Sequence, residues 1–187
     1  LRSLVGSEMC IRDRIMRAIP FGTIIMYGAL GETVTEKSGN LNLGVPGIMY
    51  LGGFAGFASA YLYENTAANP NMALCVVISL LCAFAASMLG GLIYSFLTIS
   101  LRANQNVTGL ALTTFGVGVG NFFGGSLSSL FGEGGSISLI RTGACFKATL
   151  PFASKLGLFG DTFLSFGFLA YLAIVIALLC SWFLNRT

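Results

Sequence analysis

The sequence contains no histidine, and only 9% of its 187 residues are charged. Histidine is the commonest metal ligand and general base in proteins, so its absence rules out a Ser–His–Asp triad and argues against an enzyme. Soluble domains carry about 25% charged residues. The low charge, a hydrophobic content of 55% and a mean hydropathy of +0.84 therefore indicate an integral membrane protein with several spans.

Other functional patterns are missing as well. The phosphate-binding pattern GxxxxGK[ST] does not occur, so the chain is not predicted to bind ATP through that motif. The net charge of +3 is small and spread along the chain, unlike the footprint of a nucleic-acid-binding protein. None of the five cysteines forms a CxxC pair, and three of them lie in apolar runs, where cysteine behaves as a small hydrophobic residue.

Residues 4–13, LVGSEMCIRD, resemble letter for letter one reading frame of a transposase adapter that is used to prepare shotgun sequencing libraries. Scars of this kind are excluded from reasoning about the fold. We therefore interpret residues 1–14 as a non-native, adapter-derived tail and expect the genuine chain to start near Ile15. The alternative, a genuine polar N-terminal tail, predicts native codons for this run at the source locus.

A helix that spans a membrane needs about 20 mostly apolar residues, and five runs of the chain approach that length. The predicted helices cover residues 15–34, 43–63, 72–101, 107–123 and 162–184. The fourth run is short and interrupted by glycines. Residues 124–161 are expected to form a surface segment with a short helix or re-entrant piece around 150–158. The predicted fold class is an all-α polytopic membrane protein with about five transmembrane or broken helices.

A short polar corner, residues 35–39, separates the first two apolar runs, and a segment rich in glycine and asparagine opens the second run. Unpaired backbone is costly at membrane depth, so irregular chain there normally lines a cavity that is buried in protein or filled with water. The corner is therefore a candidate for part of a solute path. Some glycines have two interpretations, as helix breaks beside a cavity or as sites of close helix packing. They are Gly44, Gly47, Gly116 and Gly118.

Three stretches of the sequence carry a resemblance to a known family. Residues 29–49 read ALGETVTEKSGNLNLGVPGIM, residues 101–112 read LRANQNVTGLAL, and residues 182–187 read WFLNRT. In the same order, they resemble three signatures of bacterial ABC importer permeases of the simple-sugar and nucleoside branch, which is related to the ribose and branched-chain amino-acid permeases. The first signature there reads roughly G-E-x-x-x-E-[RK]-x-G-x-x-N-[LI]-G-x-E-G-x-M, and the third ends a span just before the cytoplasmic coupling loop.

The chain departs from the family pattern in two ways. Pro46 stands where many members carry glutamate, which removes a possible carboxylate from the first signature. The chain is also shorter than members of the family. The resemblance therefore implies that residues 15–187 are a partial transmembrane permease domain, a fragment without the loop that contacts the ATPase.

The resemblance also implies a multi-pass protein of the bacterial plasma membrane that acts in an ATP-driven importer, with no cofactor in this chain. Its partners would be an ABC ATPase subunit that holds ATP and magnesium, a second permease subunit, an extracytoplasmic solute-binding lipoprotein and the lipid bilayer, without nucleic acid. If residues 186–187 lead into the coupling loop, the corner and Arg102 face the cytoplasm and residues 124–161 are extracytoplasmic. That orientation goes against the positive-inside count, which one or two residues decide.

The solute path is predicted at the two polar breaks of the chain. The residues expected to line it are Asn40, Asn42, Gly44, Gly47, Asn104, Gln105, Asn106 and Thr108. Neutral amides hydrogen-bond a neutral polar solute, such as a nucleoside or simple sugar, without an intramembrane charge. The alternative is that these amides only cap helix ends and join helices. Among the charged residues near the corner, only Glu32 is expected to lie deep enough for a role inside the membrane.

Two other classes of protein remain open. An ion-coupled secondary transporter would have the same broken helices, but it would more often carry an intramembrane carboxylate, and the middle of these spans is nearly free of carboxylates. A membrane enzyme lacks a catalytic constellation here, and a purely structural subunit would not need the glycine and asparagine breaks. The prediction is therefore a transport subunit rather than an enzyme.

Overall fold

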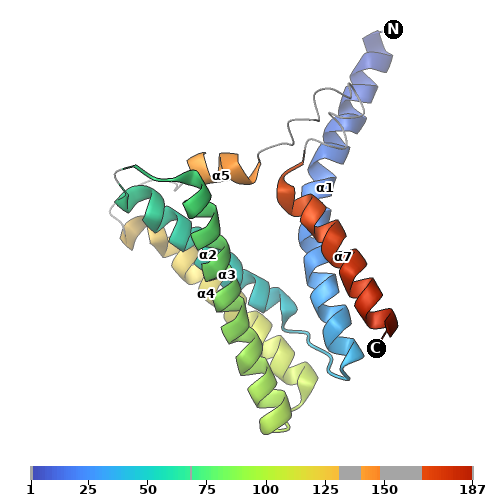
Figure 1. Ribbon diagram of the computed structural model, residues 1–187, viewed down its shortest axis with the longest axis vertical. Helices are drawn as coiled ribbons and strands as arrows, with labels where there is room; N and C mark the ends of the chain where they lie inside the picture. The colour runs from blue at the N-terminus through green and yellow to red at the C-terminus, as the bar shows by residue number, and fades with distance from the viewer. Residues whose placement is uncertain (1, 68, 131–139, 148–165, 187) are drawn as a thin grey trace. The chain divides into compact units, whose positions relative to one another are not determined.

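The computed structural model describes residues 2–67, 69–130, 140–147 and 166–186, and the regular elements in these ranges are all helices. In chain order they are α1 (Arg2–Lys37), α2 (Val45–Thr66), α3 (Met72–Ser95), the π-helix η1 (Phe96–Ser100), α4 (Gln105–Leu130), α5 (Ile140–Phe146) and α7 (Phe168–Arg186) (Figure 1). The prediction of an all-α protein is confirmed. Because α1 begins at Arg2, it runs across the boundary expected near Ile15, and the non-native origin of residues 1–14 stays a prediction.

Four helical segments are long and apolar enough to cross a membrane, judged by length and composition alone. They are Val45–Thr66, Met72–Ser100, Gln105–Ser126 and Phe168–Arg186. α1 is not among them, because Arg17, Pro20 and Glu32 lower the mean hydropathy of its apolar stretch. The polytopic class is therefore confirmed, while a membrane crossing by residues 15–34 stays a prediction.

The polar corner begins where α1 ends in a Schellman motif. Gly39 has a left-handed φ of 88°, which glycine adopts without a Cβ clash. Its N–H donates to the Glu36 carbonyl oxygen at 2.9 Å, and the next N–H, of Asn40, donates to the Thr35 carbonyl oxygen at 3.2 Å. α1 therefore continues to Lys37, beyond the predicted end at residue 34, because the stop signal of the sequence lies at Gly39.

The second polar break follows a π-helical turn at the end of α3. The Leu101 N–H donates to the Phe96 carbonyl oxygen at 3.2 Å, and Arg102 then adopts a φ of 51°. A positive φ is uncommon for any residue other than glycine, and single π-helical turns are frequent at functional sites. The predicted single helix over residues 72–101 is thus α3 followed by η1.

α4 is continuous from Gln105 to Leu130, although glycine breaks and an end near residue 123 were expected from its sequence. Two of its glycines face α2 instead of interrupting the helix. A Cβ on Gly120 would lie 2.9 Å from Cδ1 of Tyr50, and a Cβ on Gly116 would lie 2.6 Å from the Gly47 Cα. The prediction of a broken fourth helix is wrong, because these glycines allow close contact rather than a bend.

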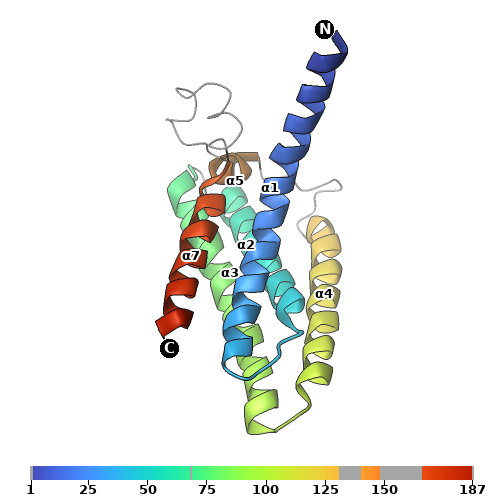
Figure 2. The same ribbon diagram turned by 90° about the vertical axis from the view of Figure 1, so that its right-hand side faces the viewer.

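The chain forms two compact units, Leu1–Leu30 with Phe146–Thr187 and Gly31–Cys145. In the first unit, the Tyr27 hydroxyl of α1 donates to the Leu169 carbonyl oxygen of α7 at 2.8 Å. In the second unit, α2 packs against both α3 and α4. Figure 2 shows both polar breaks at the same end of the second unit, near the bottom of the view.

The expected surface segment, residues 124–161, is only partly described. α4 continues into it as far as Leu130, and α5 covers Ile140–Phe146. Residues 131–139 and 148–165 lie outside the described ranges, and the short element expected around 150–158 lies outside them as well.

Candidate functional site

The corner between α1 and α2, residues 38–44, is held by side chains of neighbouring helices. The Tyr94 hydroxyl of α3 donates to the Leu41 carbonyl oxygen at 2.6 Å. The Asn42 N–H donates to Glu32 Oε1 of α1 at 2.9 Å. The irregular backbone is thus paired inside the protein, as an apolar surrounding requires.

Gln105, at the start of α4, joins the second polar break to the corner. Its Oε1 accepts the Leu41 N–H at 3.0 Å, and its Nε2 donates to Asn40 Oδ1 at 2.9 Å. Further along α4, the Thr113 hydroxyl donates to the Leu43 carbonyl oxygen at 2.7 Å. The two breaks, predicted separately from the sequence, therefore form one polar cluster, which we call the corner cluster: residues 38–44, Glu32, Tyr94, Gln105 and Thr113.

Two of the predicted path residues, Asn42 and Asn104, use their side-chain oxygens within the chain. Asn42 Oδ1 accepts the Gly44 N–H at 2.9 Å. Asn104 Oδ1 accepts the N–H groups of Asn106 at 3.0 Å and Val107 at 3.3 Å, the first turn of α4. The Asn104 bonds satisfy N–H groups that a helix start leaves free. The Asn42 bond goes to Gly44, the N-cap residue of α2, and α2 has no side-chain cap. The side-chain oxygens of Asn42 and Asn104 are therefore engaged within the chain, in agreement with the capping alternative.

Gly47 and Gly116 mark the closest approach of α2 and α4. A Cβ on Gly47 would come within 2.6 Å of the Thr113 Cα, and a Cβ on Gly116 would meet the Gly47 backbone. Backbones approach this closely only where both side chains are absent. A Cβ on Gly118, in contrast, would have no atom within 4 Å, so close packing explains Gly47 and Gly116 but not Gly118.

Thr108 and Asn106 differ in burial. Thr108 is 8% exposed, while Asn106 is exposed. Thr108 belongs to the lining of a cavity of about 410 Å³ between the end of α3, η1 and α4. The other lining residues are Ile93, Leu97, Val107, Ala111, Leu112 and Phe115. Of the predicted path residues, Thr108 thus faces a cavity, but one whose lining is otherwise apolar.

Glu32 was not placed in the solute path from the sequence, and the structure puts it in the corner cluster. Its Oε1 accepts the Asn42 N–H, while its Oε2 is buried without a hydrogen-bond partner among the described residues. The hydroxyl of Tyr94, which interacts electrostatically with Glu32, donates to Leu41 O instead. The sequence already marked Glu32 as unusual, because it is a carboxylate within an apolar run.

A second polar cluster lies at the far end of α2, in the same unit. The Thr142 hydroxyl of α5 donates to Glu64 Oε2 at 2.8 Å and lies 3.0 Å from Cys75 Sγ. Thr142 is 2% exposed and Cys75 is 1% exposed. The cluster ties α5 to the ends of α2 and α3, and its hydroxyl and thiol serve packing of these elements.

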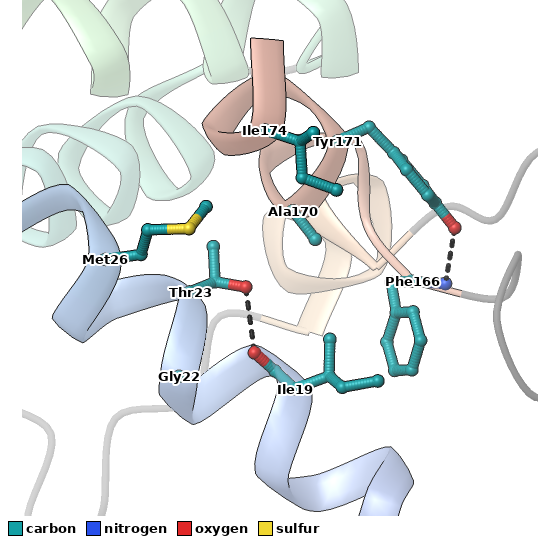
Figure 3. A pocket seen from close by; sticks show the side chains of 8 residues that line it. All are labelled: Ile19, Gly22, Thr23, Met26, Phe166, Ala170, Tyr171 and Ile174. Atoms are coloured by element: carbon teal, nitrogen blue, oxygen red, sulfur yellow. Dashed lines mark hydrogen bonds between the residues drawn. The ribbon is translucent and has the colours of Figure 1, made fainter. Parts of the chain in front are cut away.

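The first unit contains a separate cavity of about 310 Å³ (Figure 3). It is lined by Ile19, Gly22, Thr23, Met26, Phe166, Ala170, Tyr171 and Ile174. Its two hydroxyls are engaged within the chain, since Thr23 donates to the Ile19 carbonyl oxygen at 2.8 Å and Tyr171 accepts the Phe166 N–H at 3.3 Å. An apolar lining with engaged hydroxyls does not match a polar solute.

The fold and the corner cluster define the class of the protein: a polytopic helical membrane protein with polar helix breaks, as found in membrane transport proteins. The chain belongs to the family described as the permease component of the branched-chain amino acid transport system, whose match covers residues 15–187. Residues 1–14 lie outside that match. The prediction of an ABC permease relative, made from the three signatures, is confirmed.

Curated relatives of this chain are sugar and nucleoside permeases by name. It is 36% identical over 102 residues to the "Putative glucose ABC transporter permease protein TsgC13" of Haloferax volcanii, covering 54% of this chain and 28% of the relative. It is 31% identical over 163 residues to the guanosine ABC transporter permease protein NupQ of Bacillus subtilis, covering 86% of this chain and 47% of the relative.

A third relative is the nucleoside ABC transporter permease protein NupC of Lactococcus lactis, 26% identical over 168 residues, with 89% of this chain and 50% of the relative covered. The chain therefore spans about half the length, or less, of the curated relatives it matches. A comparison with solved structures finds no match.

Proposed function

We propose that this chain is part of the permease subunit of an ATP-driven importer for a small neutral polar solute, a nucleoside or a simple sugar. Family membership over residues 15–187 carries the proposal. Two supporting relatives are nucleoside permeases by name, and both are matched over most of this chain. The family description names branched-chain amino acids, but the neutral amides at the two breaks suit an uncharged solute better than a zwitterion.

The solute path runs, in this proposal, along the corner cluster and the first turns of α4. It uses Asn40, Asn42, Gly44, Gly47, Asn104, Gln105, Asn106 and Thr108. The contacts of Gln105 with residues 40 and 41, which join both breaks, support a common path. Because Asn42 and Asn104 use their side-chain oxygens for bonds within the chain, they present their NH₂ groups to the solute, and Asn106 presents its whole amide.

The proposed assembly contains a second permease subunit, ABC ATPase subunits and an extracytoplasmic solute-binding lipoprotein in the bacterial plasma membrane. ATP and magnesium are held by the ATPase and not by this chain, which carries no GxxxxGK[ST] motif. In this assembly the permease moves the solute without chemical change and is therefore not an enzyme. Copurification of the full-length protein with an ABC ATPase subunit and a second permease subunit tests the composition of the assembly.

The orientation in this proposal places the corner cluster on the cytoplasmic side. An Asn106→Cys variant in a background without native cysteines, labelled with a membrane-impermeant maleimide, tests it, because Asn106 is exposed. Labelling is expected only after the membrane is permeabilised. A variant that retains only Cys145 of α5 is expected to be labelled in intact cells. The opposite labelling pattern of the two variants would reverse the orientation.

The transport proposal is tested with the full-length permease, reconstituted in proteoliposomes with its ATPase and binding protein. Uptake of radiolabelled guanosine or glucose is expected to require ATP on the ATPase side. Uptake that follows a proton or sodium gradient without ATP would favour an ion-coupled secondary transporter. Uptake of leucine alone would show that the solute is a zwitterion and overturn the neutral-solute proposal.

A further inference from the structure

We infer that Glu32 is a solute-recognition residue, whose Oε2 accepts a hydrogen bond from a hydroxyl or N–H group of the transported solute. The inference rests on the proposed function and adds to it a carboxylate outside the predicted path residues. It starts from a single observation: Oε2 of Glu32 is the buried side-chain oxygen of the described residues that has no hydrogen-bond partner.

A buried polar atom without a partner is unusual. Most buried side-chain polar atoms in proteins are hydrogen-bonded, and an unpaired carboxylate oxygen is costly away from water. Three donors of the corner cluster bond elsewhere: the Asn42 N–H to Glu32 Oε1, the Tyr94 hydroxyl to Leu41 O, and Gln105 Nε2 to Asn40 Oδ1. The corner therefore holds a buried hydrogen-bond acceptor to which no group of the described residues donates.

The geometry fixes this acceptor in place. Because Oε1 is bound to the Asn42 N–H at 2.9 Å, the carboxylate cannot turn Oε2 toward water without breaking that bond. Asn42 is itself 8% exposed and fixed by its bond to Gly44. A positioned, buried acceptor is the arrangement that selects a neutral solute with hydroxyl donors, since a site built to bond a hydroxyl rejects analogues that lack it.

The sharpest test changes one oxygen and leaves the corner intact. In Glu32→Gln, the amide oxygen still accepts the Asn42 N–H, while an NH₂ group replaces Oε2 and turns the acceptor into a donor. Glu36→Gln is the matched control, because Glu36 is one turn further along α1 and exposed. Tyr94→Phe is the second control, because it removes the hydroxyl bond to Leu41 O while the Glu32 carboxylate and its bond from the Asn42 N–H remain.

The measurement pairs these variants with solute analogues in the reconstituted full-length transporter. Guanosine, its 2′-, 3′- and 5′-deoxy forms, glucose and its deoxy forms are the probes. In the wild type, one deoxy analogue is expected to be transported about 10- to 100-fold less efficiently than its parent, as for a hydrogen bond to a charged group. The Glu32→Gln variant is expected to transport the parent solute less efficiently than the wild type by a similar factor. Its transport of that deoxy analogue is expected to equal that of the wild type.

Several results would overturn the inference, and they differ from a failure of the proposed function. If Glu32→Gln transports the parent solute at the wild-type rate, Oε2 contacts no solute group. The preference for the parent solute over its deoxy analogue is the quantity to compare. If Glu32→Gln keeps the wild-type preference, or if Tyr94→Phe also removes it, Glu32 acts only through the shape of the corner. If the wild type transports none of the probes with ATP, the proposed function fails together with the inference.

Discussion

Glu32 and Glu64 are two carboxylates of partial burial in the same unit, one beside the start of α2 and the other near its end. Each accepts a hydrogen bond from a group on another segment, Glu32 from the Asn42 N–H and Glu64 from the Thr142 hydroxyl. They differ in the second oxygen of Glu32, which is buried and has no hydrogen-bond partner in the described parts of the chain. In our inference, unmet hydrogen-bonding capacity, rather than residue type or burial, separates the recognition group Glu32 from the structural group Glu64.

The backbone near Glu64 is regular helix, whereas the backbone near Glu32 is irregular. Glu64 lies within the regular helix α2, and its partner Thr142 lies in α5. Glu32 lies beside an irregular corner whose peptide groups need partners from other helices. A transport protein needs irregular chain where the solute passes. A contact between helices needs only that its polar groups are hydrogen-bonded. The predictions below test this contrast, starting with the packing on which the corner depends.

The largest loss is expected where α4 supports the corner. Gly116→Ala places a Cβ against the Gly47 backbone, and neither backbone can move without displacing α2 or α4. We expect a loss of about 3 kcal/mol or more in stability, or no folded protein. Gly118→Ala is the matched control on the same helix: it meets open space and is expected to be neutral or to stabilise α4 by up to about 1 kcal/mol. Thermal unfolding of the full-length protein in detergent measures both.

The pair sharpens the comparison because both substitutions add the same methyl group. Equal melting temperatures for the Gly116 and Gly118 variants would show that α2 and α4 do not cross at Gly47. The corner would then lack the support that positions Gln105 and Thr113 beside it.

The next largest loss is expected at the far end of α2. Thr142→Val keeps the shape of the side chain but removes the hydroxyl that donates to Glu64 Oε2 and contacts Cys75 Sγ. We expect a loss of about 2 kcal/mol, because a partly buried carboxylate loses a charge-assisted hydrogen bond. Thr142→Ser retains the hydroxyl and is expected to keep most of the stability. Transport per folded molecule is expected to be unchanged in both variants, and a selective loss of transport would contradict a purely structural role for this cluster.

Parts of this molecule could be predicted from the sequence because they depend on local chemistry. The end of α1 at Lys37, before Gly39, and the start of α2 beside Pro46 depend on residues within one turn of each helix end. Hydropathy alone placed the end of the first helix too early, at residue 34. The five apolar runs correspond to helices because length and hydropathy are properties of a segment alone. The resemblance of residues 29–49 and 101–112 to one family brought both breaks into a single hypothesis.

Other features depend on which segments meet and could not be predicted from the sequence. The glycines of α4 suggested breaks, but Gly116 faces Gly47 of another helix and the helix stays intact. The bonds of Gln105 join positions more than sixty residues apart. Glu32 was recognised as unusual by type alone, because whether its oxygens are paired is decided by the corner that folds against it.

A smaller loss is expected when the two breaks are separated. Gln105→Leu removes the partners of the Leu41 N–H and of Asn40 Oδ1. Because Leu41 is exposed, water replaces part of this bonding, and we expect a loss of about 1–2 kcal/mol. Asn106→Leu, one residue further on, removes an exposed amide and is expected to change the melting temperature little. Gln105→Leu should also increase hydrogen exchange of the amides at residues 40–44, and unchanged exchange there would mean that Gln105 does not hold the corner.

The smallest changes in stability are expected from the two carboxylates themselves. Glu32→Gln and Glu64→Gln each keep an amide oxygen that accepts the existing donor, from Asn42 and Thr142 respectively. Each is expected to change the stability by less than about 1 kcal/mol, so unfolding alone cannot distinguish the two positions. Transport should distinguish them, because Oε2 of Glu32 is buried without a hydrogen-bond partner among the described residues. If both variants transport like the wild type, the difference between the two carboxylates is one of packing alone; if both lose transport, the far end of α2 belongs to the path as well.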